Sequence, residues 1–492
     1  MQLIFEKSTS QRSTPQYPAL DVPAGDVEEL TGGILRERDA ALPELSELEV
    51  VRHFRALARR NVGVDDVFYP LGSCTMKYNP KMGEAVAAMQ GFAGLHPYVE
   101  FFRAQGTMKV LRHMERLLSE ITGMAAYTLH PMAGAHGEFV GMSIIRAYHD
   151  ARGTGRTRVL VPDSSHGTNP ASAAMAGFTV EPVATDEGGE VDLADLKDKL
   201  GDDLAGIMLT NPNTLGVFET RILEIAELVH DCGGLLYYDG ANLNAILGKC
   251  RPGDMGFDVV HLNLHKTFAT PHGGGGPGAG PVGVCDKLAP FLPVPRIVDN
   301  DRPDPEMPLV WSMGFPRSIG RVSGFFGNVG VVLRAYAYIR VLGAPGLREA
   351  AEDAVLAANY VRARIAEDFP AAFDRTCMHE FVATPHPRLR EAGVRALDVA
   401  KGLIDRGIHP PTVYFPLIVA EAMMIEPTET EPLAGLDRFV EALADIARQA
   451  DADPEALQAA PTTAPVGRLD ETKAAREARV VLPEPPGEID PQ

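Results

Sequence analysis

The sequence predicts an α/β fold built on a mostly parallel sheet. Short, mainly apolar segments recur between residues 158 and 262, and amphipathic segments of helical spacing separate several of them. Strands that are buried on both faces and joined by helical crossovers are typical of parallel sheets. A chain of 492 residues also exceeds the size at which one core keeps growing, so we expect more than one lobe.

Each element is assigned from its periodicity, in chain order. The first residues lack periodicity and indicate an arm, helical spacing begins near Glu47, and residues 69–98 form an irregular stretch rich in Gly, Pro and Tyr. Helices are expected at 108–121, 138–150, 191–200 and 221–231. The expected strands are 158–162, 178–183, 205–209, 235–238, 259–262 and 281–285.

The pattern changes after residue 318. Two long helices are expected at 324–342 and 346–368, followed by a mixed unit with strands at 380–383 and 423–426 and a last helix at 471–479. We therefore predict an arm with an irregular segment (1–105), a large α/β domain (106–330), a smaller C-terminal α/β domain (331–470) and a peripheral tail (471–492).

Composition narrows the class of protein. The net charge of −20 and the pI near 5.2 argue against nucleic-acid and anionic-membrane partners. Apolar runs stay well below the roughly 20 residues that cross a bilayer, and the first residues lack the pattern of a secretory signal, so we expect a cytoplasmic protein. Five scattered cysteines indicate reduced thiols and no metal site, with only Cys74 placed among other reactive side chains.

Polar side chains gather where the expected strands end. Because the carboxyl ends of parallel strands meet at one edge of a sheet, these residues should lie together. They are His166 after the first strand, Asn211 after the third, Asp239 and Asn242 after the fourth, and His265 and Lys266 after the fifth.

This set fits pyridoxal phosphate. Lys266 would bind its aldehyde as a Schiff base, Asp239 would pair with the pyridine nitrogen, and His166 would stack on the ring. Asn211 or Asn242 would bond the ring hydroxyl, and His265 lies beside the lysine. The turn of Ala133, Gly134 and Ala135, opening a helix at residue 136 or 137, would offer N–H groups to the phosphate.

Simpler interpretations exist for each residue. Asp239 could cap a helix, His166 could be an ordinary hydrogen-bonded histidine, and Lys266 could be a solvated residue before a flexible turn. A glycine-rich turn before a helix is weak evidence for phosphate. The placement of all these residues at successive strand ends favours the cofactor hypothesis.

Four long motifs carry a resemblance to a known family. They are LGSCTMK at 71–77, SHGTNPASA at 165–173, YDGANLNA at 238–245 and NLHKTF at 263–268, and the likeness continues through residues 379–381 and 424–431. Together they resemble the lysine-bearing, C-terminal half of the glycine decarboxylase P-protein family of the glycine cleavage system. In length the chain is similar to subunit 2 of the split form of that enzyme.

The resemblance implies a fold and a reaction. The fold would be the type I, aspartate-aminotransferase-like fold of pyridoxal-phosphate-dependent transferases. The activity would be that of glycine dehydrogenase (aminomethyl-transferring): glycine loses CO2, and its aminomethyl group passes to the lipoyl arm of H-protein. A separate subunit 1 would complete an α2β2 assembly. The glycine tract at 273–280 would border the channel for the lipoyl arm.

Other assignments are less direct. Residues 73, 75 and 77–79 and His96 are expected near the site, and Arg317 and Arg321 are candidate partners of a substrate carboxylate. His136 stands where longer family members carry glutamine, so His166 is preferred as the stacking residue. The alternatives are an amino-acid decarboxylase, a desulfurase-like enzyme or a non-catalytic scaffold. Cys285, in an apolar strand, argues against the desulfurase.

Overall fold

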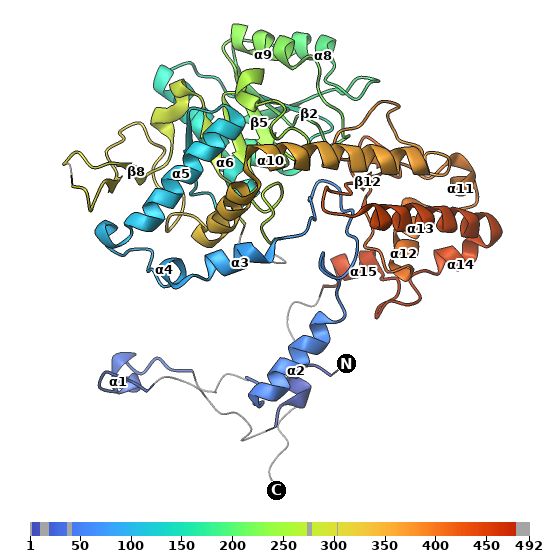
Figure 1. Ribbon diagram of the computed structural model, residues 1–492, viewed down its shortest axis with the longest axis horizontal. Helices are drawn as coiled ribbons and strands as arrows, with labels where there is room; N and C mark the ends of the chain where they lie inside the picture. Colours follow the sequence, from blue (N-terminus) through green and yellow to red (C-terminus); the bar gives the residue numbers. More distant parts are fainter. Residues whose placement is uncertain (1, 10–18, 37–41, 273–277, 303, 479–492) are drawn as a thin grey trace. The chain divides into compact units, whose positions relative to one another are not determined.

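The computed structural model describes residues 2–9, 19–36, 42–272, 278–302 and 304–478. It contains two compact units (Figure 1). One unit comprises Met1–Asp66 with Pro465–Gln492, and the other comprises Val67–Ala464. The finer four-part division predicted above stays a prediction. Among the described residues, none of the helices has the length and apolar character needed to cross a membrane.

The terminal unit is built on short helices. Its main element is α2 (Glu47–Ala58), which begins at a capping box: Ser46 Oγ accepts from the Glu49 N–H, and the Glu49 carboxylate accepts from the Ser46 N–H. The other helices described in this unit are η1 (Phe5–Lys7), α1 (Val27–Leu30) and α15 (Glu471–Arg476). Helical spacing near Glu47 thus predicted α2 correctly.

The large unit is organised by a seven-stranded sheet of order β1-β7-β6-β5-β4-β2-β3. Neighbours from β6 through β3 pair in parallel, whereas β7 is antiparallel to β6 and to β1. The strands are β1 (Ala126–Thr128), β2 (Arg158–Pro162), β3 (Thr179–Val183), β4 (Leu204–Leu209), β5 (Leu235–Gly240), β6 (Val259–Leu262) and β7 (Val282–Val284). The predicted mostly parallel sheet is confirmed.

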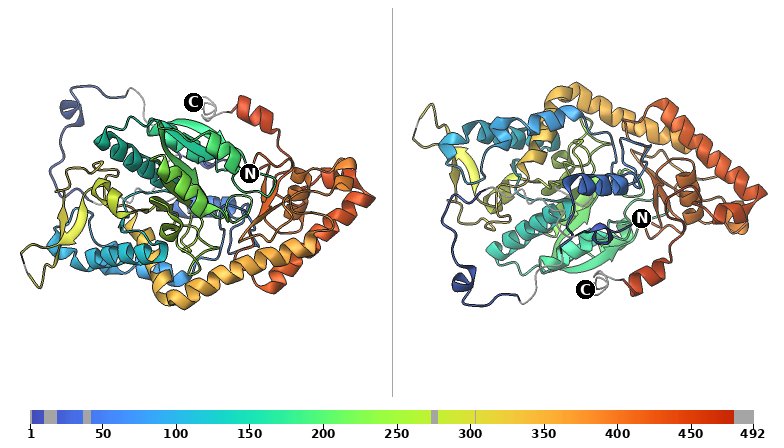
Figure 2. Two further views of the ribbon diagram at one scale, coloured as in Figure 1. Left: turned by 90° about the horizontal axis from the view of Figure 1, so that it is seen from above. Right: turned by 90° about the horizontal axis from the view of Figure 1, so that it is seen from below.

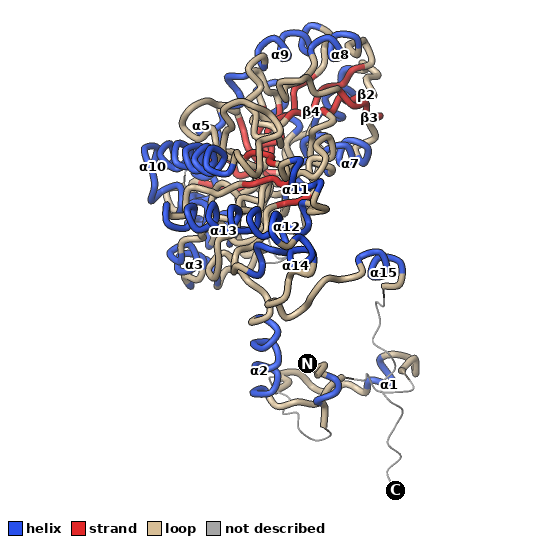
Figure 3. The backbone as a smooth tube through the Cα atoms, turned by 90° about the vertical axis from the view of Figure 1, so that its right-hand side faces the viewer, coloured by secondary structure: helices blue, strands red, loops and turns tan. Residues whose placement is uncertain are grey.

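Helices cover both faces of this sheet, as the red strands among blue helices in Figure 3 show. On β5, Leu236 and Tyr238 belong to one core, while Leu235 and Tyr237 belong to the core on the opposite face. This alternation follows the period of two along a strand. The covering helices are α5 (Gln105–Thr122), α6 (Gly134–Arg152), α7 (Thr168–Met175), α8 (Leu193–Asp198) and α9 (Ile222–Asp231).

A smaller lobe follows helix α10 (Val329–Ile365), which runs from beside the sheet into the lobe (Figure 2). Gly343, with φ of 60°, interrupts α10 close to the break predicted between two helices. The lobe holds an antiparallel sheet of order β10-β12-β11. Its elements are β10 (Phe381–Ala383), α11 (Pro387–Glu391), α12 (Ala396–Asp405), β11 (Thr412–Val413), β12 (Met423–Ile425), α13 (Leu433–Ala452) and α14 (Pro454–Gln458).

Several short elements lie outside the sequence prediction. The irregular stretch contains α3 (Lys81–Ala87), α4 (Gln90–Ala93) and, just beyond, η2 (Phe101–Arg103). β1, β11 and the hairpin of β8 (Arg296–Asp299) and β9 (Leu309–Ser312) are too short to show a period. The remaining short elements are η3 (Pro252–Met255) and η4 (Asp286–Phe291).

Candidate active site

A cavity of about 260 Å³ lies at the carboxyl ends of the parallel strands. Its wall combines residues from the sheet and the loops after its strands, from the start of α6, from residues 71–77 and from the two residues just before β10 (Phe381–Ala383). We call residues 71–77 the strap. The wall residues are Ser73, Gly134, Ala135, Glu138, His166, Thr168, Thr210, Pro212, Thr214, Asp239, Ala241, Asn242, Asn263, His265, Lys266, His379 and Glu380.

Lys266 reaches the cavity from the loop after β6. Its Nζ donates a hydrogen bond to the Ser73 carbonyl oxygen at 2.7 Å. The strap adopts an unusual backbone there, because Ser73 and Thr75 both have positive φ, 65° and 50°. Gly72 passes so close to Met424 that an added Cβ would lie 2.3 Å from its side chain and 2.6 Å from its carbonyl oxygen. Only glycine fits this approach.

Asp239, near the end of β5, is 4% exposed and carries three polar neighbours. Its Oδ2 accepts from Asn169 Nδ2 at 3.0 Å, its Oδ1 accepts from the Ala241 N–H at 3.1 Å, and His261 Nε2 lies 3.5 Å from Oδ1. Burial alone would raise the pKa of Asp239, but these neighbours and Lys266 outweigh it and hold the pKa below the ordinary value. Asp239 is therefore ionised at neutral pH.

His166 enters the wall from the loop after β2. Its ring lies edge-on to Phe415 at a centroid distance of 5.8 Å, and its Nδ1 contacts Thr168 Oγ1 at 2.9 Å. Thr168 Oγ1 in turn donates to Glu138 Oε1 at 2.8 Å. Burial lowers the pKa of His166, so the ring is neutral at pH 7. His136, by contrast, lies outside the wall, and its Nδ1 accepts from the Met132 N–H.

Of the two asparagines predicted to bond the ring hydroxyl, only Asn242 lines the cavity. Its Nδ2 donates to Thr75 Oγ1 at 2.5 Å and to Glu426 Oε1 at 2.8 Å. Asn211 is absent from the wall, because its amide bonds both backbone groups of Glu219.

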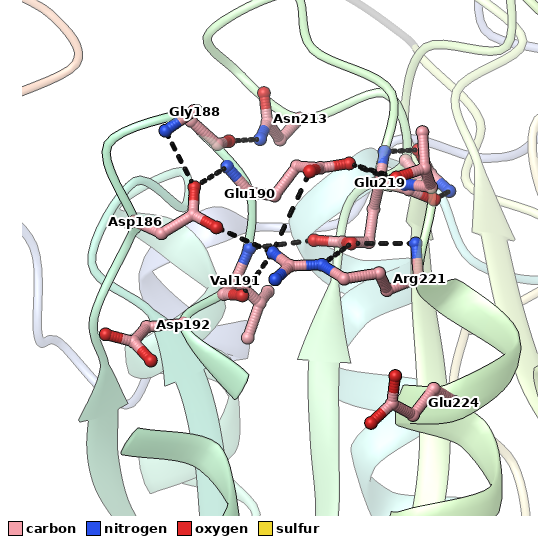
Figure 4. Close-up of polar contacts among 12 residues, drawn as sticks. Asp186, Gly188, Glu190, Val191, Asp192, Asn213, Glu219, Arg221 and Glu224 are labelled. Atoms are coloured by element: carbon pink, nitrogen blue, oxygen red, sulfur yellow. Dashed lines mark hydrogen bonds and ion pairs between the residues drawn. The ribbon is translucent and has the colours of Figure 1, made fainter. Parts of the chain in front are cut away.

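The side chain of Glu219 itself belongs to the polar cluster of Figure 4, where Arg221 Nη2 donates to Asp186 Oδ2 at 2.7 Å and the Glu219 carboxylate accepts from the Val191 N–H. Asn242 is therefore part of the cavity wall and Asn211 is not. Arg221 forms ion pairs with Asp186 and Glu219, and these pairs stabilise the loop after β4 without contributing to the wall.

Helix α6 begins at Gly134, two or three residues earlier than the predicted start at residue 136 or 137, with Ala133 as its extended N-cap. Ala133 is outside the wall, whereas Gly134 and Ala135 line it. Ala133 makes no side-chain cap, so the first N–H groups of α6 remain available to an anion. A Cβ on Gly134 would come within 2.5 Å of Asn263 Oδ1, so the Asn263 side chain would have to shift to admit a larger residue.

His265 lies beside Lys266 with a ring edge-on to His272 at 5.2 Å. Its Nδ1 accepts from the Ala279 N–H at 3.4 Å. Burial, with the nearby His272 and Lys266, lowers the pKa of His265 to about 3, so its ring is neutral. The proposed channel border at 273–280 falls largely outside the described residues, since 273–277 are not described.

Sequence reasoning missed the buried carboxylates. Glu138 accepts from Thr168 and Ser172, and burial together with Asp239 raises its pKa to about 7. Glu380 Oε2 accepts from the Ser73 N–H at 2.7 Å. Glu426 accepts from Asn242 and from both the N–H and the hydroxyl of Thr75.

The only signal for Glu380 and Glu426 was their presence in two motifs of the family resemblance. Their partners lie more than 180 residues away along the chain. The two candidate arginines, Arg317 and Arg321, are outside the wall. No arginine belongs to it among the residues that the structure describes.

Comparison with known proteins decides the family. The model of the aminotransferase class-V family matches residues 142–275, and that of the glycine dehydrogenase C-terminal domain matches residues 350–462. A Bacillus velezensis protein named probable glycine dehydrogenase (decarboxylating) subunit 2 is 55% identical over 477 residues, 96% of each chain. One of the same name from Desulforamulus reducens is 55% identical over 97% of this chain and 98% of its own. This chain belongs to the glycine dehydrogenase (decarboxylating) subunit 2 family.

Solved structures confirm the type I fold. A crystal structure titled glycine decarboxylase (P-protein) of the glycine cleavage system, in inhibitor-bound form, matches with a TM-score of 0.72 and 22% identity, over 86% of this chain and 95% of its own. A glutamate decarboxylase from Lactobacillus brevis matches with a TM-score of 0.64 and 14% identity, over 86% and 97%. The family resemblance and the fold class predicted from the sequence are both confirmed.

Proposed function

We propose that this chain is the pyridoxal-phosphate-dependent glycine decarboxylating subunit of the glycine cleavage system. It releases CO2 from glycine and passes the aminomethyl group to the lipoyl arm of H-protein. The observation that carries this function is that an ionised Asp239 and Lys266 line the same cavity, in a chain whose relatives are named for glycine decarboxylation. An amino-acid decarboxylase of other specificity is the main alternative.

The residues present fit pyridoxal phosphate. The wall supplies a primary amine at Lys266, a carboxylate at Asp239 and, at Gly134 and Ala135, the N-terminus of a helix without a side-chain cap. Two wall atoms, Asn263 Oδ1 and Thr210 Oγ1, are buried and have no hydrogen-bond partner among the described residues. Buried polar atoms are normally paired, so these two support a polar ligand in the cavity.

Each side chain has a task in this reaction. When bound, the cofactor accepts the electron pair that remains as CO2 leaves. Asp239 would hold a proton on the pyridine nitrogen, and Asn169 and the Ala241 N–H keep its carboxylate aimed and ionised. The Lys266 amine would hold the aldehyde, with Ser73 O fixing its position beforehand. His166, neutral, would cover one face of the ring.

Roles for the other predicted residues follow from their places. Asn242 would bond the ring hydroxyl in preference to Asn211, and His265 would pack beside the lysine loop. Gly134 and Ala135 would bind the phosphate, with Ala133 setting the start of the helix. These assignments rest on the wall of the cavity and on the chemistry of each donor.

Partners and location belong to the same proposal. The relatives are named subunit 2, which supports a subunit 1 partner in an α2β2 assembly. Helix α2 adds support, because Leu48, Val51, Phe54 and Leu57 are all exposed on it. Lipoylated H-protein and glycine are the proposed substrates, and the proposed location is cytoplasmic.

The test is exchange of labelled bicarbonate into the glycine carboxyl group. The purified chain is assayed alone, then with subunit 1, then with lipoylated H-protein added. We expect exchange in the full mixture and loss of exchange in Lys266→Ala. Carboxyl exchange with another amino acid, and none with glycine, would overturn the proposal.

A further inference from the structure

His379 is a buried histidine without a hydrogen bond. Its side chain is 2% exposed, and neither Nδ1 nor Nε2 has a hydrogen-bond partner in the part of the chain that the structure describes. It nevertheless lines the cavity that holds Lys266. Leaving an N–H unpaired inside a protein destabilises the fold, so such a group is expected to meet a ligand.

Glu380 lies next to it in the same wall. Its Oε1 is 3.8 Å from His379 Nε2, and its Oε2 accepts from the Ser73 N–H. The carboxylate of Glu426 lies close by, held by Thr75 and Asn242. Two carboxylates that are buried this close together cannot both ionise.

Both wall residues are neutral at pH 7. Burial and then the Glu426 charge raise the pKa of Glu380 well above the ordinary value, so Glu380 keeps its proton. Burial and Lys266 lower the pKa of His379 to about 3, so its ring has one N–H and no charge. The pair therefore presents two neutral donors to the cavity.

The substrate carboxylate needs a partner of this kind. No arginine lies in the described wall, and Lys266 is the cation there. A carboxylate that leaves as CO2 loses its charge in the transition state, so an arginine clamp would stabilise the starting state more than the transition state. Neutral donors orient the carboxylate while stabilising its charged starting state less than an arginine would.

We propose that His379 and Glu380 form the subsite for the carboxylate of the substrate amino acid. The His379 N–H and the Glu380 O–H each donate to a carboxylate oxygen, and the strap fixes Glu380 through the Ser73 N–H. This inference rests on the proposed function, and it names the residues that select an amino acid over a simple amine.

The test compares binding of glycine and methylamine, which differ by the carboxylate. Equilibrium dissociation constants are measured from the visible absorbance of the cofactor-loaded chain with its partner subunit. In His379→Phe we expect glycine to bind about 10- to 100-fold more weakly, the range for a lost hydrogen bond to a charged group, with methylamine unchanged. His113→Phe, on α5 and outside the wall, is the matched control.

Further variants separate binding from folding. His379→Asn and His379→Gln each keep one N–H donor, near the position of Nδ1 and of Nε2 respectively. The variant that replaces the donating ring nitrogen should bind glycine more tightly than His379→Phe does. Glu380→Gln keeps a neutral donor and should bind glycine within a fewfold of the original chain, whereas Glu380→Leu should not. The protonated state of Glu380 is checked without cofactor, because Glu380→Gln should remove a carboxylic-acid band from the infrared spectrum.

Two outcomes overturn the subsite. One is equal weakening of glycine and methylamine in His379→Phe, and the other is no weakening of either. If the original chain prefers a different amino acid, the proposed function fails. The subsite is then tested with that amino acid and its decarboxylated amine.

Discussion

The two sides of the cavity are built in different ways. On the sheet side, Asp239 takes its hydrogen bonds from Asn169 and Ala241, which follow strands β2 and β5 of the same sheet. On the strap side, Thr75 and Ser73 bond Glu426 and Glu380, from 351 and 307 residues away. The sheet side follows from strand order, whereas the strap side exists only when the strap and the small lobe come together.

The rate of the reaction should depend mainly on the sheet side of the cavity. Asp239→Asn is therefore expected to have the largest effect on turnover. An amide cannot keep a proton on the pyridine nitrogen, so we expect bicarbonate exchange to fall by roughly 10²–10⁴-fold, the range for loss of a positioned proton partner. Steady-state exchange rates and thermal unfolding are measured together. A fall that matches a loss of folded protein would contradict this role.

The strap side should govern stability, through a buried ion pair. Lys77 Nζ lies 2.6 Å from Glu429 Oε1, with side chains 1% and 8% exposed. Lys77→Met leaves the Glu429 carboxylate buried without its cation and should lower the free energy of unfolding by about 3–5 kcal/mol. Denaturant unfolding measures this loss.

The double variant Lys77→Met with Glu429→Leu sharpens the test, because it removes both charges. Much of the lost stability should return in it. A single variant as stable as the original chain would show that this pair does not hold the strap.

Glu138 gives a smaller effect that depends on pH. Its pKa is about 7 in the folded chain, against 4.5 ordinarily, so the folded state keeps a proton that the unfolded state loses. The stability from this proton is complete below pH 4.5 and is lost as pH rises to about 7, by up to about 3 kcal/mol. Glu138→Gln does not titrate, so the unfolding free energy of the original chain should fall by this amount relative to that of Glu138→Gln as pH rises through the window. A constant difference would contradict the raised pKa.

The comparison also explains what the sequence could predict. Strands β2 to β6 are apolar runs with clear ends, so the residues that follow them could be placed at one edge. Asn211 shows where this prediction fails. It follows β4 as expected, but its amide is hydrogen-bonded to the backbone of Glu219 and does not line the cavity.

The strap side could not be predicted in this way. His379, Glu380 and Glu426 lie in a lobe whose three-stranded sheet is made of strands of two or three residues. Their closeness to Ser73 and Thr75 depends on the Leu71–Ile425 bridge and on the tight approach of Gly72 to Met424. Local periodicity carries no information on such contacts.

The most direct test of the account is to trap the cofactor on the protein. The chain is loaded with pyridoxal phosphate, reduced with borohydride and digested, and the modified peptide is identified by mass spectrometry. We predict a single pyridoxyl group on Lys266, and none in Lys266→Ala. Modification of a different lysine, or no modification of the loaded chain, would contradict the central claim that this cavity holds the cofactor.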